Sequence, residues 1–176
     1  TSRDPRYFSI AAYRLNALST YTATVVVTIP DDSVTDPPSS SASLTFQLGS
    51  SPVIANIDGG SAQTITLSDA FTLDASESYD VDYPDTTGRL SYAWDCLENS
   101  PTYGSSCDLP LSVSMSSSTV TVPANTLSAD RSYNFSVLVT SVSGETDNSY
   151  TVVTVTSRSV PRVSVVSVSP KYNPTE

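Results

Sequence analysis

Apolar and polar residues alternate along most of the chain, and this pattern predicts β-strands rather than helices. Residues 71–74 and 90–96 each alternate with a period of two, which is typical of a half-buried strand. The only tryptophan, Trp94, lies in the middle of the second stretch, where a β-sandwich buries one large aromatic side chain between its sheets. Cys96 points to the same face as Trp94. These two stretches, joined by an acidic loop, form the centre of the predicted fold.

Further strands are expected wherever the alternation recurs between turns rich in Pro, Gly and Asp. They are expected at residues 7–10, 22–29, 44–48, 53–57, 65–67, 109–115, 120–122, 133–139 and 150–156. No segment shows a sustained helical period. Strands at this spacing predict an all-β fold made of tandem immunoglobulin-like (fibronectin III-like) β-sandwich modules.

An internal repeat divides the chain. Residues 15–21 (LNALSTY) align with residues 127–133 (LSADRSY) at an offset of 133 − 21 = 112. At that offset Phe8 and Ile10 fall on Val120 and Val122. The repeat predicts that residues 1–50 are the C-terminal strands of a first module and that residues 51–158 are a complete module. Residues 159–176 are a tail strand or the start of a third module, because 160–162 align with 51–53.

The repeated Leu…Tyr spacing suggests a structural role for two tyrosines. Tyr21 and Tyr133 each lie at the corner before a long strand, where a tyrosine hydroxyl bonds back to the backbone of the corner in sandwich folds. The alternative is two ordinary core aromatics, and the shared spacing favours the corner.

Composition excludes several classes of function. The net charge of −10 argues against nucleic acid as a partner, because nucleic-acid binding needs basic patches. The longest apolar run, around residues 25–27, is far too short to span a membrane, so no membrane insertion is expected. The chain has no His and a single Lys, Lys171, which removes the usual activators of a nucleophile. We therefore expect no catalytic activity.

The two cysteines indicate the compartment. Cys96 and Cys107 are the only pair available, and in a Ser/Thr-rich all-β chain they favour a disulfide and an extracellular or cell-surface location. Two reduced core thiols are the alternative.

The central stretch resembles a known family. Leu73-Asp-Ala-Ser-Glu-Ser, followed by Asp80 and Asp82 and then by Leu90-Ser-Tyr-Ala-Trp-Asp-Cys96, is similar to the receptor-for-egg-jelly module and to the related polycystic kidney disease repeat. The resemblance covers the complete module well and the first fragment weakly. It implies non-catalytic, tandem extracellular modules of polycystin-like receptors, surface-layer proteins and adhesive or filamentous assemblies. Val81 stands where the family often has Pro or Gly in its turn.

The acidic loop is a candidate cation site. Asp80, Asp82 and Asp85 lie in one short turn, and calcium prefers several oxygen ligands from such a loop. The favoured interpretation is an acidic surface turn whose carboxylates cap the loop backbone. No other cofactor is expected.

Two features of the sequence suggest contact with carbohydrate, one as an attached glycan and one as a ligand. Asn134-Phe-Ser136 is an N-glycosylation sequon, and the alternation of its strand points Asn134 outward. Tyr79, Tyr83 and Tyr103 are the candidates for an aromatic platform if the chain binds glycans instead.

The most direct functional expectation is a structural or adhesive building block of a surface appendage or fibril, with itself or neighbouring modules as partner. Three strands at the N-terminal end leave an open apolar face, and residues 163–168 at the other end are strand-like. The tail of one subunit would then complete the open module of the next by strand addition. A polycystin-like receptor ectodomain is the first alternative, and a carbohydrate-binding module is the second.

Overall fold

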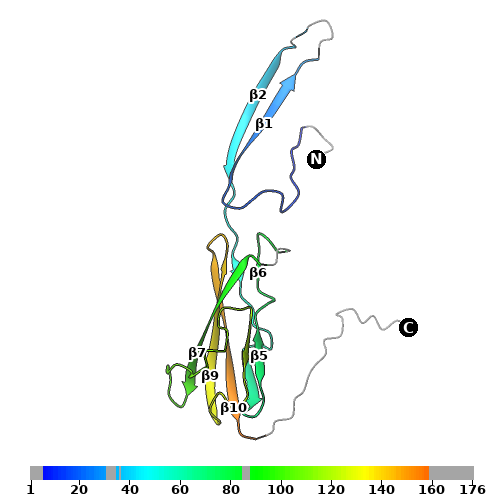
Figure 1. Cartoon of the computed structure of the whole chain (residues 1–176). Coiled ribbons are helices and arrows are strands. Elements are labelled where there is room, and N and C mark those ends of the chain that lie inside the picture. Colours follow the sequence, from blue (N-terminus) through cyan, green and yellow to red (C-terminus); the bar gives the residue numbers. More distant parts are fainter. Residues whose placement is uncertain (1–5, 31–34, 36, 85–87, 159–176) are drawn as a thin grey trace, which may run out of the picture.

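A computed structural model describes residues 6–30, 35, 37–84 and 88–158. Within these residues the chain forms ten strands and no helix. A two-stranded hairpin projects from one end of a β-sandwich, so that the described part of the molecule is elongated (Figure 1). The all-β sandwich expected from the alternating pattern is confirmed.

The sandwich has one large sheet and two strand pairs that oppose it. The large sheet has the order β4-β10-β9-β7, in which β4 pairs with β10 in parallel and all other pairs are antiparallel. Its strands are β4 (Ala62–Thr66), β7 (Leu90–Ser100), β9 (Arg131–Ser141) and β10 (Thr146–Thr156). The opposing pairs are β3 (Val53–Ile54) with β6 (Tyr79–Asp80) and β5 (Phe71–Asp74) with β8 (Thr119–Val122).

The core lies between these layers and follows the predicted alternation. Phe135 is fully buried, and its ring meets that of Phe71 edge-on at 5.9 Å between centroids. Trp94 is buried as well, and its indole Nε1 donates a hydrogen bond of 2.8 Å to the carbonyl of Ser117. The other fully or almost fully buried apolar side chains are Val53, Leu73, Ala75, Val120, Val122, Val137, Val139, Val153 and Val155. Apolar burial of this extent is the main stabilising contribution to such a domain.

The hairpin consists of β1 (Thr20–Thr28) and β2 (Ser39–Gln47), which pair with each other and with no other described strand. Residues 7–14 run beside it without forming a strand. The strand predicted at residues 7–10 is therefore wrong, because these residues form no strand pairing with β1, β2 or any other described strand.

The strand predicted at residues 109–115 is also wrong. Pro110 begins a turn in which its carbonyl accepts the N–H of Val113 at 2.9 Å. Val113 is nonetheless buried and Met115 is half-buried against the core. The apolar alternation here reflects an irregular segment that packs on the sandwich, not a sheet. Residues 159–176 and Asp85 lie outside the described residues.

Candidate functional site

The hairpin β1–β2 repeats the closing hairpin of the sandwich, β9–β10. Tyr21 lies opposite Phe46, just as Tyr133 lies opposite Val153. The offsets are 112 on the first strand and 153 − 46 = 107 on the second, and the same two offsets relate the residue pairs next to both turns. The difference of five corresponds to a longer turn between β1 and β2. The two hairpins therefore share one register.

The corners that precede the two hairpins are equivalent too. The Tyr133 hydroxyl accepts the backbone N–H of Ser128 at 3.0 Å, and the Tyr21 hydroxyl accepts that of Asn16 at 2.7 Å. In both cases the donor lies five residues before the tyrosine. This is the corner bond that the repeated Leu…Tyr spacing suggests.

Backbone conformation supports the same equivalence. Leu18 and Asp130 both have a φ of 57°, and Tyr13 and Asn125 have φ values of 60° and 57°. Each pair is separated by 112 residues. Positive φ is uncommon for residues other than glycine, so four such residues at one offset indicate a shared local fold. Asn125 and Asp130 are of residue types that adopt this conformation more readily, whereas no sequence signal marks Tyr13 and Leu18.

The two hairpins differ in what covers them. Val137 and Val139 in β9 are completely buried, whereas their counterparts Val25 and Val27 are 54% and 63% exposed. Leu44 in β2, on the same side, is 68% exposed. The cause is the missing second layer: no described strand lies over this side of β1–β2.

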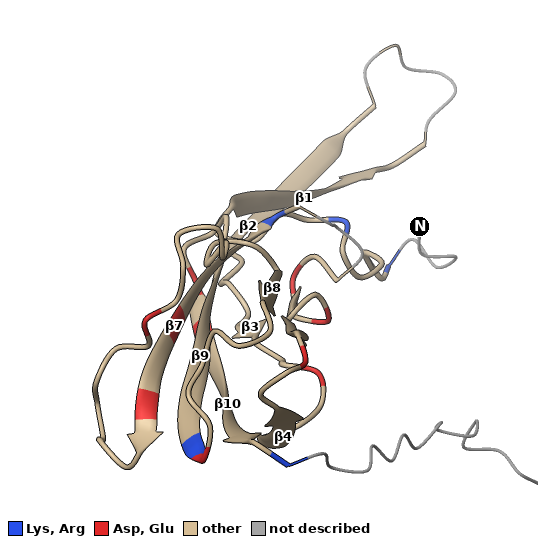
Figure 2. Cartoon of the chain, turned by 60° about the horizontal axis from the view of Figure 1, so that its bottom comes forward, with Lys and Arg blue, Asp and Glu red and all other residues tan. Residues whose placement is uncertain are grey.

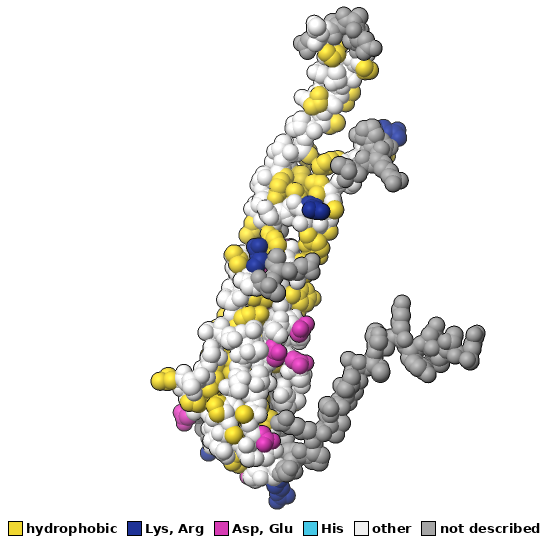
Figure 3. Space-filling view, turned by 45° about the vertical axis from the view of Figure 1, so that its right-hand side comes forward, with side chains coloured by type: hydrophobic (Ala, Val, Ile, Leu, Met, Phe, Trp, Pro, Cys, Tyr) yellow, Lys and Arg dark blue, Asp and Glu magenta, His cyan; other side chains and the backbone are white. Residues whose placement is uncertain are grey.

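We call this surface the open face and define it by Val25, Val27 and Leu44 together with Phe8 and Ile10, which flank the hairpin. Phe8 is 76% exposed. The N-terminal segment and the hairpin enclose a groove of about 1090 Å³ whose only charged lining residue is Arg14. Neither β1 nor β2 carries a charged residue (Figure 2), and hydrophobic side chains gather on this part of the molecule (Figure 3). A contiguous apolar surface of this kind is typical of a protein–protein contact.

Side chains and linker backbone fix where the hairpin leaves the sandwich. Ser50 donates its hydroxyl to Glu145 Oε1 at 2.6 Å, and the backbone N–H of Ser51 bonds to Asp82 Oδ2 at 2.7 Å. The backbone N–H of Ala17 reaches the hydroxyl of Tyr83 at 3.3 Å. These bonds connect the base of the hairpin to one end of the sandwich.

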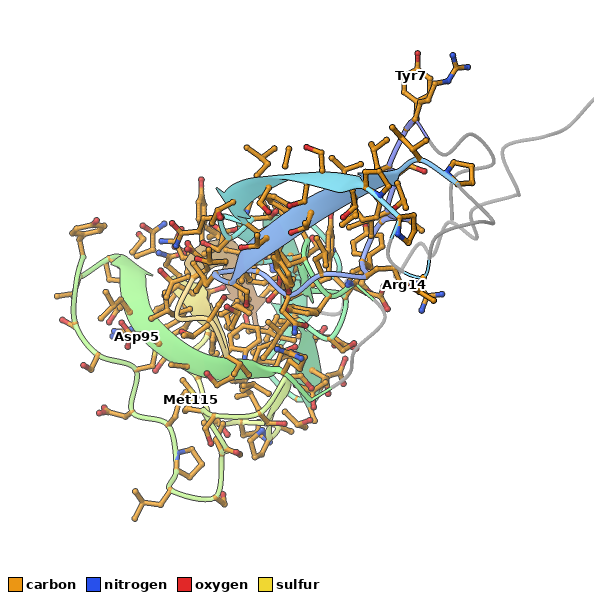
Figure 4. All side chains as sticks on the ribbon, turned by 90° about the horizontal axis from the view of Figure 1, so that it is seen from above. Tyr7, Arg14, Asp95 and Met115 are labelled. Atoms are coloured by element: carbon orange, nitrogen blue, oxygen red, sulfur yellow. A yellow bond between two sulfur atoms is a disulfide. The ribbon has the colours of Figure 1, made fainter. Side chains whose placement is uncertain are left out.

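The disulfide lies at the other side of the sandwich. Cys96 in β7 is bonded to Cys107, which closes a loop beside the strand. Of the two, Cys96 is buried next to Trp94 in the core. Seen from above (Figure 4), Asp95 on β7 and Met115 on the irregular segment lie on the sandwich, whereas Tyr7 and Arg14 belong to the N-terminal segment.

One ion pair, between a buried carboxylate and a partly exposed arginine, was not foreseen. Glu98 is buried at the end of β7, and Arg131 Nη1 donates to both of its carboxylate oxygens at 2.8 and 3.0 Å. Glu98 continues the inward side of the alternation set by Trp94 and Cys96. A charged residue at an inward position is the signal that would have found this pair, because a buried carboxylate needs a partner.

The acidic loop uses its carboxylates on the backbone. Asp80 is buried, and its Oδ1 accepts the N–H of Asp82 at 2.9 Å. Asp82 accepts the N–H of Ser51, as above. Asp85 is outside the described residues, and within those residues no three His, Cys, Asp or Glu side chains lie close enough together to hold a metal. Calcium binding by Asp80, Asp82 and Asp85 stays a prediction.

The candidate tyrosines do not share one surface. Tyr79 and Tyr83 line a pocket of about 550 Å³ together with Tyr92, and the guanidinium of Arg89 stacks 3.9 Å from the centre of the Tyr83 ring. Burial, with a smaller contribution from the charge of Asp74, raises the pKa of Tyr92. Tyr103 is 86% exposed in the disulfide loop, beyond the far end of β7. Glycan binding therefore stays a prediction for Tyr79 and Tyr83 without Tyr103.

Asn134 lies on the outer side of the large sheet, in register with Leu97 and Val152 of the adjacent strands. It is half-buried, and its Oδ1 has no hydrogen-bond partner in the described part of the chain. Glycosylation there stays a prediction.

Comparison with known proteins places the chain in a family. The model of the REJ domain matches residues 4–175. Two solved structures are similar in part: a nucleoside hydrolase-related hypothetical protein from Saccharophagus degradans that is associated with carbohydrate metabolism, and the PKD domain of the KIAA 1837 protein. The first is 18% identical, with a TM-score of 0.45 over 61% of this chain and 26% of that one. The second is 25% identical, with a TM-score of 0.39 over 66% of this chain and 100% of that one.

The chain thus spans about a quarter of the first of these proteins. None of the curated proteins compared with the chain matches it significantly. Among the described residues, no helix has the length and apolar character needed to cross a membrane. The family match extends over the hairpin and the sandwich together, and it confirms the resemblance first seen in the central stretch. The chain belongs to the REJ domain family.

Proposed function

We propose that this chain is a non-catalytic extracellular structural module, a building block of a surface appendage or fibril. The open face carries the proposal. A hairpin with the register of a core hairpin exposes Val25, Val27 and Leu44, and it does so at one end of an elongated molecule. A second protein surface that covers this face would join molecules end to end.

Three further observations support a non-catalytic extracellular role. The disulfide between Cys96 and Cys107 is of the kind that persists in oxidising compartments. The REJ domain of polycystin-type proteins is extracellular. The chain has no His and a single lysine, Lys171, so its sequence is poor in the groups that usually activate a nucleophile.

A receptor ectodomain of the polycystin type is the second candidate, and membership of the REJ domain family favours it. There the module would act as a spacer within one polypeptide, with the open face covered by neighbouring modules.

Electron microscopy of native material distinguishes the appendage building block from the receptor ectodomain. Filaments support the appendage, and discrete particles that do not join end to end point to the receptor. Mass spectrometry of the same material without reductant reports the disulfide and any glycan at Asn134. A measurable hydrolytic activity that survives purification to homogeneity would contradict the non-catalytic role.

A further inference from the structure

The outer side of the large sheet carries a group of exposed apolar side chains. We call it the outer patch and define it by Leu97 of β7, Leu138 of β9, and Tyr150 and Val152 of β10, which all point away from the core. Leu97, Leu138 and Tyr150 are 36%, 45% and 62% exposed. The outward positions of these three strands hold one charged residue, Asp95. A weakly charged apolar surface of this kind is typical of a face that another group covers.

Asn134 lies within the outer patch. It is directly opposite Leu97 on one side and Val152 on the other, and Tyr150 is its diagonal neighbour on β10. The Cβ atoms of directly opposite residues are about 5 Å apart in an antiparallel pair, and those of diagonal neighbours are about 7 Å apart. A group attached to Asn134 therefore starts within reach of three of the four patch side chains.

The side-chain amide of Asn134 presents its nitrogen to the solvent. Of its two polar atoms, only Oδ1 is enclosed without a hydrogen-bond partner in the described part of the chain. No described residue is hydrogen-bonded to Nδ2 either, so Nδ2 is the atom of the pair that solvent reaches. An N-linked glycan is attached at this nitrogen.

Two further features favour attachment. Asn134-Phe135-Ser136 is an N-glycosylation sequon, in which Phe135 is buried in the core and Ser136 points outward with Asn134. The disulfide between Cys96 and Cys107 indicates an oxidising compartment, and N-linked glycans are found on proteins of that compartment.

A carbohydrate also suits the chemistry of this surface. The C–H groups on the face of a sugar ring pack against an aromatic face such as that of Tyr150, and against aliphatic side chains such as Leu97. The hydroxyl groups on the edge of the ring need polar partners. The neighbouring outward positions supply these without charge, as Ser136, Thr140 and Asn148.

We infer that Asn134 carries an N-linked glycan whose first sugars pack on the outer patch and cover it. This inference rests on the extracellular location in the proposed function and goes beyond it, because it assigns an occupant to a face that the open face does not include. The outer side of the large sheet is then shielded by carbohydrate and is not a contact surface for a second protein.

Three variants of the full-length chain, secreted from eukaryotic cells, test this inference. Asn134→Gln removes the acceptor nitrogen, Ser136→Ala removes the sequon and keeps Asn134, and Ser136→Thr is the matched control that keeps the sequon. Mass spectrometry of the peptide that contains Asn134 reports the glycan. Hydroxyl-radical footprinting reports how fast Tyr150 is oxidised, with Tyr7, which is 69% exposed in the N-terminal segment, as the internal reference.

We expect a glycan at Asn134 in the wild type and in Ser136→Thr, and none in the other two variants. Oxidation of Tyr150 should be several-fold slower in the two glycosylated proteins than in Asn134→Gln and Ser136→Ala, whereas oxidation of Tyr7 should be the same in all four. Trimming the glycan to its first sugar with an endoglycosidase should leave most of this protection in place. Circular dichroism checks that each variant is folded.

The other outcomes overturn the inference in distinguishable ways. A secreted wild type with an intact disulfide and no glycan at Asn134 would overturn it and leave the extracellular function standing. A glycan without protection of Tyr150 would mean that the sugars project away from the sheet and do not cover the patch. Protection that persists in Asn134→Gln would mean that a second protein surface covers the patch instead. Native protein found inside cells with both cysteines reduced would overturn this inference and the extracellular function together.

Discussion

At the scale of single residues, the two corner tyrosines show how much of the local structure the spacing of residues in the sequence can predict. A Leu six residues before a Tyr, repeated at an offset of 112, suggested the bonds of Tyr21 to Asn16 and of Tyr133 to Ser128. Spacing did not reveal that only Tyr133 is buried. Burial depends on the second layer of the sandwich, which local sequence does not encode.

Tyr133→Phe should therefore destabilise the sandwich and Tyr21→Phe should not. Removing the Tyr133 hydroxyl leaves the N–H of Ser128 without its partner in a half-buried corner, at a cost of about 1–2 kcal/mol in the free energy of unfolding. At the more exposed Tyr21 corner, water replaces the lost bond. Denaturant titration followed by the fluorescence of Trp94 measures both. Equal losses would mean that the two corners belong to one cooperative unit.

Asp74 is expected to make the free energy of unfolding depend on pH. Hydrogen bonds from the backbone and the side chain of Ser76 lower the pKa of Asp74 from its ordinary value of 3.8, against a small opposing effect of burial. A carboxyl whose pKa is lower in the folded state stabilises the protein above its unfolded pKa, and this contribution is lost as the pH falls through the folded pKa.

The difference in stability between the wild type and Asp74→Ala should therefore be present at pH 6 and shrink below about pH 3.8, the ordinary value. Because the group is close to the surface, the effect should be small and should decrease further in high salt. Thermal melts from pH 2 to pH 6 at two salt concentrations measure it. A difference that stays constant across this range would assign the loss to Ser76 packing rather than to charge.

At the scale of elements, alternation located the strands, but pairing decided which of them form. Residues 20–28 and 131–141 became strands because each has a neighbour in register. The equally alternating residues 109–115 did not, because Pro110 begins a turn. Nor did residues 7–10, which pair with no described strand. The alternation in a sequence shows which side chains of a strand point inward and which point outward. Which other strand hydrogen-bonds to its edge depends on the rest of the fold.

Equivalent positions in the two hairpins allow a matched test of how burial differs between them. Val137→Ala should cost about 2 kcal/mol or more, because it leaves a cavity in a fully packed core. Val25→Ala, at the equivalent position of β1, should cost under about 0.5 kcal/mol in the monomer, because Val25 is already half exposed. The comparison uses the denaturation midpoint at a protein concentration where the chain is monomeric. A large loss for Val25→Ala would mean that the open face is covered within one molecule.

The disulfide is the other element-scale feature with a measurable contribution. Cys96 and Cys107 are eleven positions apart, so the bond removes entropy from the unfolded chain that corresponds to about 3 kcal/mol. Adding reductant should lower the unfolding midpoint accordingly, and the double variant Cys96→Ala/Cys107→Ala should behave like the reduced wild type. If reduction has no effect while the double variant is destabilised, the loss comes from core packing at Cys96 instead.

At the scale of the whole molecule, the chain consists of two parts of unequal stability. A hairpin of two strands is at best marginally stable alone, and β1–β2 pairs with no other described strand. The hydrogen bonds that join its base to the sandwich, such as Ala17 to Tyr83 at 3.3 Å, involve the connecting segments and not β1 or β2 themselves. Opening of the hairpin should therefore leave the sandwich folded, and exposure of its backbone should not require global unfolding.

Native-state hydrogen exchange at a protein concentration where the chain is monomeric tests this directly. Amides of β9 and β10 should exchange only through global unfolding, and their rates should rise steeply with added denaturant. Amides of β1 and β2 should exchange much faster and with little dependence on denaturant, because a local opening exposes little new surface. Exchange of β1 and β2 as slow as that of β9 and β10, with the same steep dependence on denaturant, would contradict this expectation and would mean that the hairpin unfolds together with the sandwich.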